Sequence, residues 1–396
     1  MTWAIFSIVA NKMSQFGCSA YTYAQYSYKP YTRAPFFQLS EQMVDNTTIN
    51  GGTHPAYPFL TGHGGAHQVS LFGYLGLRQL PDDILHVDPN LPPQIPYLRY
   101  RDFYWHGWPI SAWSNYTHTT IRRAVGTPPL DTADNKFANE TITIHSGPDL
   151  NVTVYQLPIK GSVVIPNRQV GSKNTVAGNL VQCQPIISTN AFEPGQFPIS
   201  VADGAASTKW QPSLADDVSA VTISFPESEV GAPVSGFYFD WAKAPPVNAT
   251  VIFHNKTLQD PTVALTSVNS SDFTIVHALT NIVQSGPYDA ATTNLDMIAI
   301  PTGNSTNVTL SSPVPAARYA SLLIVGNQAL GPADVEAKNG TGATVAEWAI
   351  IGQDKQSNTS SSSPQPAKRK MDLRDASALS DAESFIRRRR QLLSLN

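Results

Sequence analysis

The prolines that follow Arg78 constrain this fold most strongly, because they exclude helices from the next stretch of the chain. They stand at Pro81, Pro89, Pro92, Pro93 and Pro96. Short β-like runs follow, separated by turn-forming residues, at 97–100, 102–105, 117–122, 141–145 and 152–157. Short runs with this spacing are typical of the strands of a β-sandwich.

The segment before Arg78 has a different pattern. Residues 2–14 and 34–46 have apolar side chains near helical spacing, which predicts two helices, the first of them mostly buried. Residues 17–32 hold several tyrosines without a helical stripe and are interpreted as a loop, whose rings either pack or stack on sugars. The apolar residues behind the two helix predictions are Trp3, Ile5, Phe6, Ile8, Val9 and Met13, and then Phe36, Phe37, Leu39 and Met43.

A glycine-rich stretch between Gly51 and Gly65 contains two histidines and a His63-Gly64-Gly65 turn. It is too rich in Gly and Pro for a helix or a central strand, so we expect a loop that leads into a helix from Ala66. Backbone N–H groups before a helix suit oxyanions or sugar hydroxyls. A tight turn between buried helices is the equally simple alternative.

The composition limits the function classes. The formal net charge is −3, and charged residues make up 14% of the chain. No basic stripe with interleaved aromatics occurs, so we expect no nucleic-acid partner. We also expect no transmembrane segment. Cys18 and Cys183 lie far apart without metal-ligand spacing; a disulfide is one interpretation, and two isolated buried thiols are the favoured one.

Acceptor sequons for N-glycosylation are dense, which indicates the secretory pathway. The apolar start, Met1 to Ala10, lacks a basic n-region and a cleavage site, so we interpret it as an interior helix rather than a signal segment. The chain is therefore expected to begin inside a domain of a longer protein. The candidate glycosylation sites are Asn46, Asn115, Asn139, Asn151, Asn248, Asn255, Asn269, Asn304, Asn307, Asn339 and Asn358.

The C-terminal half predicts a further β-unit and a tail. From about residue 165 to about 350, alternating runs such as 220–225 and 250–253 recur without a long helical pattern. From Asp354 the chain is rich in Ser, Asn and Gln, which indicates a linker or disorder. Residues 371–395 are a candidate charged helix, and the arginine run at 387–390 is interpreted as solvated.

Several long strings carry resemblances to known families. Residues 33–78, which include PFFQLSEQ at 35–42, and the string LRYRDFYWHGWPI at 98–110 resemble the fungal acid trehalases of glycoside hydrolase family 65. The strings NAFEPG at 190–195, ADG at 202–204, STKWQP at 207–212 and VSGFYFDW at 234–241 resemble the discoidin (coagulation factor 5/8 type C) domain, a β-sandwich jelly roll that often binds carbohydrates or surfaces.

The resemblance implies an α+β multidomain fold. Residues 1–80 would be the C-terminal helices of an (α/α) six-hairpin barrel. Residues 81–164 would form a small C-terminal sandwich, and residues 165–352 a discoidin-like jelly roll. Residues 353–396 would be a Ser-rich linker and charged tail.

The family is implied to hydrolyse α,α-trehalose to glucose with inversion and without a metal or organic cofactor. Inverting glycosidases use a general acid and a base roughly 6.5–9.5 Å apart. The family's acid lies in a D-E-Y type motif, which this chain lacks. Glu41 is the candidate base, although a solvated helix-face glutamate is its simpler interpretation. The candidate substrate contacts are His54, His63, Gly64 and Gly65.

Two functions therefore remain open. One is the C-terminal portion of a trehalase acting on trehalose or a related α-glucoside, in a secreted, cell-wall, periplasmic or vacuolar protein. The alternative is a non-catalytic protein that binds carbohydrate, such as a cell-wall glycan, or the cell surface. A phosphorylase is a weaker third reading.

Overall fold

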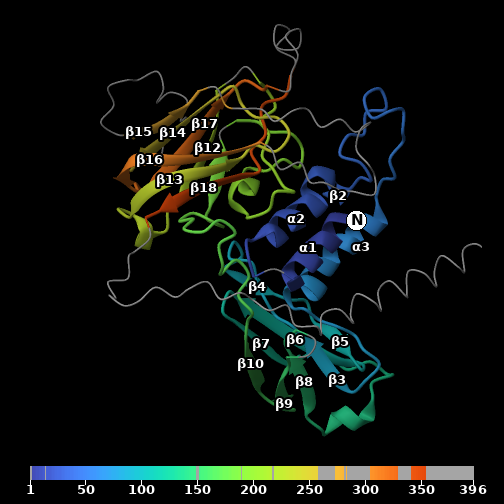
Figure 1. Ribbon diagram of the computed structural model, residues 1–396. Coiled ribbons are helices and arrows are strands. Elements are labelled where there is room, and N and C mark those ends of the chain that lie inside the picture. The colour runs from blue at the N-terminus through green and yellow to red at the C-terminus, as the bar shows by residue number, and fades with distance from the viewer. Residues whose placement is uncertain are drawn as a thin grey trace, which may run out of the picture. The chain divides into compact units, whose positions relative to one another are not determined.

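The computed structural model describes residues 2–13, 15–148, 151–188, 190–215, 218–256, 273–280, 282, 304–328 and 340–353 (Figure 1). The described chain is mostly β-sheet, preceded by a few helices. The tail predicted at 353–396 lies outside the described residues apart from Gln353, so the prediction of a linker and charged helix there stays untested.

The helical segment, defined here as residues 2–80, begins with α1 (Thr2–Met13) and α2 (Ser19–Tyr28), which pack together. A 3-10 turn, η1 (Lys29–Tyr31), leads to a short hairpin of β1 (Thr32–Arg33) and β2 (Gln38–Leu39). The segment ends with α3 (Leu60–Gln68) and a π-helical continuation, η2 (Val69–Tyr74).

The helix predicted at 2–14 is confirmed as α1, but the prediction that its apolar face is buried is wrong. The buried positions of α1 are Ala4, Ser7 and Asn11. Small and polar residues let α1 and α2 approach closely, and Ser7 donates to the carbonyl oxygen of Ala20 at 2.7 Å. The apolar side chains of α1 that remain exposed are Ile5, Phe6, Val9 and Met13.

Two further predictions for this segment are wrong. Residues 17–32, predicted as a loop, contain α2, because alanines at 20 and 24 pack against a neighbouring helix and Pro30 marks its end. Residues 34–46, predicted as a helix, form the β1–β2 hairpin and a loop instead. Phe37 has a positive φ of 54°, and the chain reverses direction between the antiparallel strands β1 and β2.

The first sandwich, defined as strands β3–β10, follows the prolines. One sheet has the order β10-β7-β6-β4, with β5 also pairing with β6, and the other has the order β3-β8-β9. The strands are β3 (Ile84–Val87), β4 (Tyr97–Arg99), β5 (Phe103–Trp105), β6 (Trp108–Asn115), β7 (His118–Arg123), β8 (Ile142–Ser146), β9 (Thr153–Leu157) and β10 (Ser162–Pro166).

The core of the first sandwich joins side chains of both sheets, such as Ile110 of β6 and Ile144 of β8. The same cluster includes Ala4, Val69 and Leu75 of the helical segment, so the two parts share one apolar interior. Strands were predicted at 97–100, 102–105, 117–122, 141–145 and 152–157, and these are confirmed as β4, β5, β7, β8 and β9.

The second sandwich, defined as strands β11–β18, has sheets of order β11-β12-β17-β14-β15 and β16-β13-β18. Runs of β-branched and aromatic residues favour these strands. Its core includes three fully buried tryptophans, Trp210, Trp241 and Trp348. The strands are β11 (Ile186–Ser188), β12 (Ser219–Ser224), β13 (Pro233–Asp240), β14 (Asn248–His254), β15 (Phe273–Leu279), β16 (Ser305–Pro315), β17 (Tyr319–Val325) and β18 (Glu347–Gly352).

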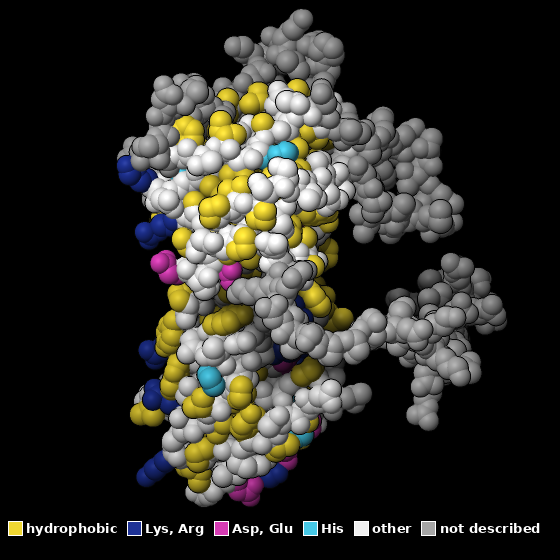
Figure 2. Space-filling view, turned by 60° about the vertical axis from the view of Figure 1, so that its left-hand side comes forward, with side chains coloured by type: hydrophobic (Ala, Val, Ile, Leu, Met, Phe, Trp, Pro, Cys, Tyr) yellow, Lys and Arg dark blue, Asp and Glu magenta, His cyan; other side chains and the backbone are white. Residues whose placement is uncertain are grey.

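Uncharged side chains dominate the molecular face in Figure 2, in keeping with the low share of charged residues. Within the described part of the chain, no helix is both long and apolar enough to cross a membrane. Strand β10 pairs with β7 through Pro166, so the first sandwich uses residues on both sides of the expected domain boundary at 164/165. The division at 80, 164 and 352 stays a prediction.

Candidate active site

Glu41 lies on an exposed loop, defined here as residues 40–59, that leads from β2 to α3. Two hydrogen bonds tie this glutamate to Ala56 across the loop. The backbone N–H of Glu41 donates to the carbonyl oxygen of Ala56 at 3.0 Å, and the N–H of Ala56 donates to Oε2 of Glu41 at 2.9 Å. The carboxylate is therefore held in place at one oxygen, although it lies on a loop and not on the predicted helix.

Arg33 fastens the base of the same loop. Its Nε donates to Oδ2 of Asp45 at 2.5 Å, and its Nη2 donates to Oδ1 at 3.2 Å. Nη2 also donates to the carbonyl oxygens of Gln42 and Met43 at 2.8 and 2.9 Å. Ser40 donates to Oδ1 of Asp45 at 2.6 Å. The hydrogen bonds from Arg33, and then those from Ser40, hold the pKa of Asp45 below its usual value.

His63 connects the loop to α3 from the helix side. The backbone N–H of Leu39 donates to Nε2 of His63 at 3.0 Å, so this nitrogen carries no proton in the described geometry. The N–H of Phe59, just before α3, donates to the carbonyl oxygen of Leu39 at 2.7 Å. Leu39 of β2 is thus hydrogen-bonded to Phe59, just before α3, and to the His63 side chain in the first turn of α3.

The expected His63-Gly64-Gly65 turn is not formed. α3 begins at Leu60, so all three residues are helical, and Gly65 is buried. The glycines at 62, 64 and 65 are poor helix formers, so the local sequence does not favour a helix here. The helix places His63 where its Nε2 accepts from the N–H of Leu39. Gly64 is exposed and its position has open space beside it. His54 is exposed on the Glu41 loop, in the part that does match the predicted loop.

A hollow of about 520 Å³ lies beside this arrangement. Its walls include the exposed ring of Phe37, the imidazole of His63 and the side chain of Lys29, which extends from the end of α2. Thr32 and His67 add polar groups, while Tyr28, Leu39 and Ala66 complete the lining. An aromatic ring beside hydroxyl, imidazole and ammonium groups can bind a polar ligand with a flat apolar face.

Sequence reasoning placed Glu41, His54 and His63 in one region, and the structure brings the segments around Glu41 and His63 together through Leu39. It missed Arg33, Lys29 and Phe37 as parts of the site. The opposite charges of Arg33 and Asp45 are the one feature of the sequence that could have predicted their ion pair. Among the described residues, no cluster of three or more His, Cys, Asp or Glu has the arrangement of a metal site.

Known proteins resemble this chain over most of its length. Residues 77–134 match the model described as "Glycosyl hydrolase family 65, C-terminal domain". The chain is 60% identical over 359 residues to the cell wall acid trehalase of Arthroderma benhamiae, and the match covers 89% of this chain and 34% of that protein. It is 61% identical over 355 residues to the acid trehalase of Emericella nidulans, covering 89% and 33%.

Most of this chain is therefore similar to fungal acid trehalases, and residues 77–134 match the C-terminal domain of glycoside hydrolase family 65. The chain spans about a third of the length of those relatives. A more distant match, the cell wall acid trehalase of Candida albicans, is 28% identical and covers 63% of the chain and 23% of that protein.

Solved structures resemble part of this chain only weakly. A chitosan-binding module of a Paenibacillus chitosanase/glucanase covers 44% of this chain and 98% of that module, at 14% identity and a TM-score of 0.29. A TM-score this low does not establish the fold of the second sandwich. Its discoidin-like identity therefore stays a prediction.

Proposed function

We propose that this chain supplies the water-activating carboxylate of an enzyme that hydrolyses α,α-trehalose to two glucose molecules with inversion. The observation that carries the proposal is the double attachment of Glu41 to Ala56, within a segment that resembles acid trehalases. A general base must be held at a fixed place to accept a proton from water. With Oε2 occupied by the Ala56 N–H, Oε1 is the oxygen that takes this proton.

The second carboxyl group of the pair is proposed to come from residues outside this chain. Residues 1–80 contain only two acidic residues, Glu41 and Asp45. Asp45 is paired with Arg33 and accepts a further hydrogen bond from Ser40, so it is committed to the loop. A general acid must protonate the leaving oxygen of trehalose, and neither Glu41 as the base nor Asp45 is available for that step.

The hollow beside His63 is proposed to hold one glucose unit. The ring of Phe37 is 70% exposed and can stack on a pyranose face, while Lys29 and His67 can donate to hydroxyl oxygens. Thr32 Oγ1 donates to the carbonyl oxygen of Tyr28 at 2.7 Å, so it can accept from a sugar hydroxyl. The attachment of Leu39 to His63 fixes the segment between Phe37 and Glu41, which joins the sugar contact to the base. His54 and Gly64, which are exposed and are not among the residues that line the hollow, remain proposed substrate contacts.

The helical segment is proposed to be the last part of an (α/α) barrel. The exposed apolar side chains of α1 support this, because soluble helices normally bury such a stripe. The matched relatives are about three times as long as this chain, and their further residues would cover that stripe.

A secreted location is proposed from two observations. The matched relatives include cell wall acid trehalases and a periplasmic/secreted acid trehalase of Candida glabrata. The sequon asparagines that are described and exposed suit glycans; they are Asn46, Asn115, Asn139, Asn151, Asn248, Asn255 and Asn307. Asn304 is less exposed and donates to the carbonyl oxygen of Ala242. Asn269, Asn339 and Asn358 lie outside the described residues.

The test is glucose release from trehalose at acidic pH by this chain and by a form extended upstream to the length of the relatives. We expect only the extended form to be active, and Glu41→Gln to lower its kcat by at least about 10². Glu227→Gln, at an exposed position of the second sandwich, is the matched control.

Activity of the unextended chain would contradict the assignment of the general acid. Full activity of the Glu41→Gln variant would remove Glu41 as the base. Glycan binding without hydrolysis by either form would favour the non-catalytic binding protein.

A further inference from the structure

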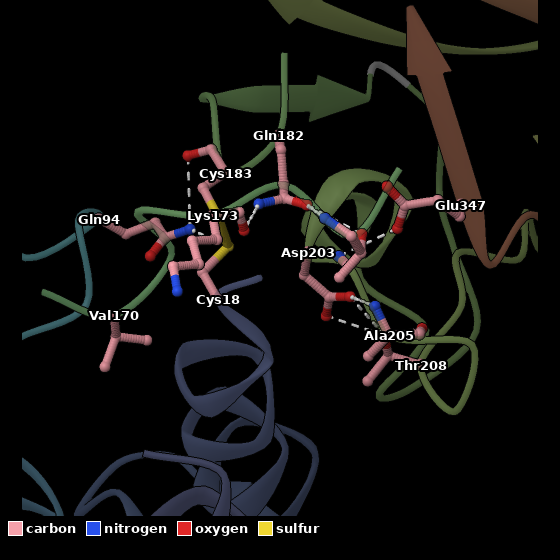
Figure 3. The surroundings of a disulfide bond; sticks show 12 residues. Cys18, Gln94, Val170, Lys173, Gln182, Cys183, Asp203, Ala205, Thr208 and Glu347 are labelled. Carbon is pink, nitrogen blue, oxygen red and sulfur yellow. Dashed lines mark hydrogen bonds between the residues drawn. A yellow bond between two sulfur atoms is a disulfide. The ribbon is translucent and has the colours of Figure 1, made fainter. Parts of the chain in front are cut away.

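Two buried carboxyl groups lie where the helical segment meets the second sandwich (Figure 3). Asp203 follows the 3-10 turn η4 (Pro198–Ala202) and is 0% exposed, and Glu347 begins β18 and is 4% exposed. The backbone of Asp203 contacts the helical segment directly, because the N–H of Cys18 donates to its carbonyl oxygen at 2.7 Å. Beside this contact, a disulfide joins Cys18 to Cys183. We call this region the junction.

In the described part of the chain, no positively charged side chain pairs with either carboxyl. The residue opposite Glu347 in the β13–β18 register is another acid, Asp240. The other titratable neighbours are Tyr23 and Tyr26 of α2, which face Asp203, and Tyr238 of β13, which faces Glu347. These phenols carry no positive charge, so ionisation of both carboxyls is costly.

The hydrogen bonds of Asp203 only partly offset its burial. Thr208 Oγ1 lies 2.8 Å from Oδ2 and 3.0 Å from Oδ1 of Asp203, and 3.1 Å from the carbonyl oxygen of Ala205. A hydroxyl has one hydrogen and cannot serve all three acceptors. Hydrogen bonds from Thr22, Thr208 and the Ala205 N–H lower the pKa of Asp203, but its burial raises the pKa by more. Oδ1 accepts from the Ala205 N–H at 3.0 Å.

The hydrogen bonds of Glu347 lead to the same conclusion. Its Oε2 accepts from the N–H of Gly204 at 3.0 Å, while its Oε1 is buried without a hydrogen-bond partner among the described residues. A buried, unpartnered oxygen costs much more in a charged carboxylate than in a neutral acid. Burial raises the pKa of Asp203 to about 7. Burial, and then the charge of Asp203, raises the pKa of Glu347 well above its usual value.

We propose that Asp203 and Glu347 form an acid-dependent clamp, which holds the Cys18 segment against the second sandwich while at least one carboxyl is protonated and loosens when both are ionised. Gly204 connects the two halves, because it follows Asp203 and donates to Glu347. Charge on both side chains therefore strains the same short turn that contacts Cys18. The clamp is complete in acid and fails toward neutral and basic pH.

The sign of the pH dependence follows from the direction of the two shifts. Both carboxyls have a raised pKa in the folded protein, so the folded state binds more protons than the unfolded state. Their contribution to stability is fully present below the unfolded pKa of about 4. It is lost as the pH rises through about 7 for Asp203. This is opposite to the usual effect of ion-paired carboxylates.

The test measures how fast a phosphine reductant that is active in acid reduces Cys18–Cys183 in the whole chain between pH 5 and pH 8. Cys18 is 0% exposed and Cys183 is 9% exposed, so reduction requires the junction to open. The rate is divided by that of an exposed disulfide peptide at each pH, which removes the pH dependence of the reagent. We expect the ratio to rise on the order of tenfold over this range.

Two variants separate the clamp from general loosening. Asp203→Asn keeps a donor at Thr208 without a charge, so we expect a slow reduction rate that no longer depends on pH. Glu347→Gln leaves Asp203 as the one ionisable carboxyl of the pair, so we expect its reduction rate to lose the rise with pH as well. Glu227→Gln is the control and should behave as the wild type.

A flat wild-type ratio, or an unchanged rise in both variants, would overturn the proposal. If Asp203→Asn does not fold, the wild type and Glu347→Gln still decide. The measurement needs no trehalose, so its failure is separate from a failure of the proposed function.

Discussion

The Cα atoms of Cys18 and Cys183 lie 5.9 Å apart, and a disulfide joins these two residues across a sequence separation of 165. The closed loop contains α2, α3 and all of the first sandwich. Gln94 packs against the bond, with Nε2 donating to Sγ of Cys18 at 2.9 Å. The favoured sequence interpretation, two isolated buried thiols, is therefore wrong. The connection fixes the start of α2 to the beginning of the second sandwich.

The double variant Cys18→Ser/Cys183→Ser should lose stability. Removing a cross-link over so long a loop frees the unfolded chain and costs about 2–5 kcal/mol. Thermal unfolding of the chain without reductant measures the effect. The wild type in the presence of reductant should reproduce the variant's lower Tm, and equal Tm values for oxidised wild type and variant would contradict a stabilising role.

Loss of the Arg33–Asp45 pair should impair catalysis in the extended enzyme. Arg33→Met removes the donors to Asp45, Gln42 and Met43, so the Glu41 loop loses its attachment at the base. Misplacement of a reacting group by about 1 Å can cost on the order of 10² in rate. We expect kcat to fall by that order while global Tm changes little. Arg101→Met, at an exposed arginine of the first sandwich, is the control.

The acceptor nitrogen of His63 should be replaceable by another acceptor. His63→Phe leaves the buried N–H of Leu39 without a partner, at a cost of about 1–3 kcal/mol. His63→Gln retains an acceptor oxygen on a side chain of similar reach, so it should restore much of the Tm and of the extended enzyme's kcat. If both variants behave alike, the hydrogen bond to Leu39 does not explain the role of His63.

His254 should destabilise the second sandwich in acid, opposite to the clamp. Its Nε2 lies 2.9 Å from Oγ of Ser321 and its Nδ1 lies 2.7 Å from the carbonyl oxygen of Lys256, and the residue is 1% exposed. Burial lowers its pKa. A lowered histidine pKa gives stability that is present above the unfolded value of about 6.5 and is lost as the pH falls. Comparison of Tm values at pH 7.5 and pH 5 for wild type and His254→Gln measures the contribution of His254 to stability at each pH. The variant should lose less Tm on acidification.

The sequence predicted the β-rich part well because its strands obey a local rule. β8 alternates buried and less buried residues from Ile142 to Ser146, and such alternation is visible without knowledge of the partner strands. β6 was missed, since Pro109 interrupts the run Trp108–Asn115 and its mostly buried residues do not alternate with exposed ones. Neighbouring strands on both sides of β6 explain this burial.

The helical segment was harder to predict because its structure depends on tertiary contacts. α2 has no apolar stripe, and its alanines become meaningful only once α1 lies against them. His63 was placed in a loop because Gly62, Gly64 and Gly65 are poor helix formers, yet the helix extends over all three. Many pairs of polar residues in this segment could form hydrogen bonds. Their spacing in the sequence does not reveal that Glu41 bonds to Ala56 and Arg33 to Asp45.

Because apolar residues of α1 are exposed in this chain, Val9→Lys should affect the stability of this chain and of the extended form differently. Phe6 and Val9 are 45% and 51% exposed in this chain, so Val9→Lys should change its Tm little and should reduce self-association. In the form extended to the length of the relatives, further helices would bury position 9, and an unpaired lysine there should cost on the order of 3 kcal/mol. Thr2→Lys, at an exposed polar position of α1, should be neutral in both forms. Equal Tm changes for Val9→Lys in the two forms, or a monomeric and cooperatively folding unextended chain, would contradict the barrel proposal.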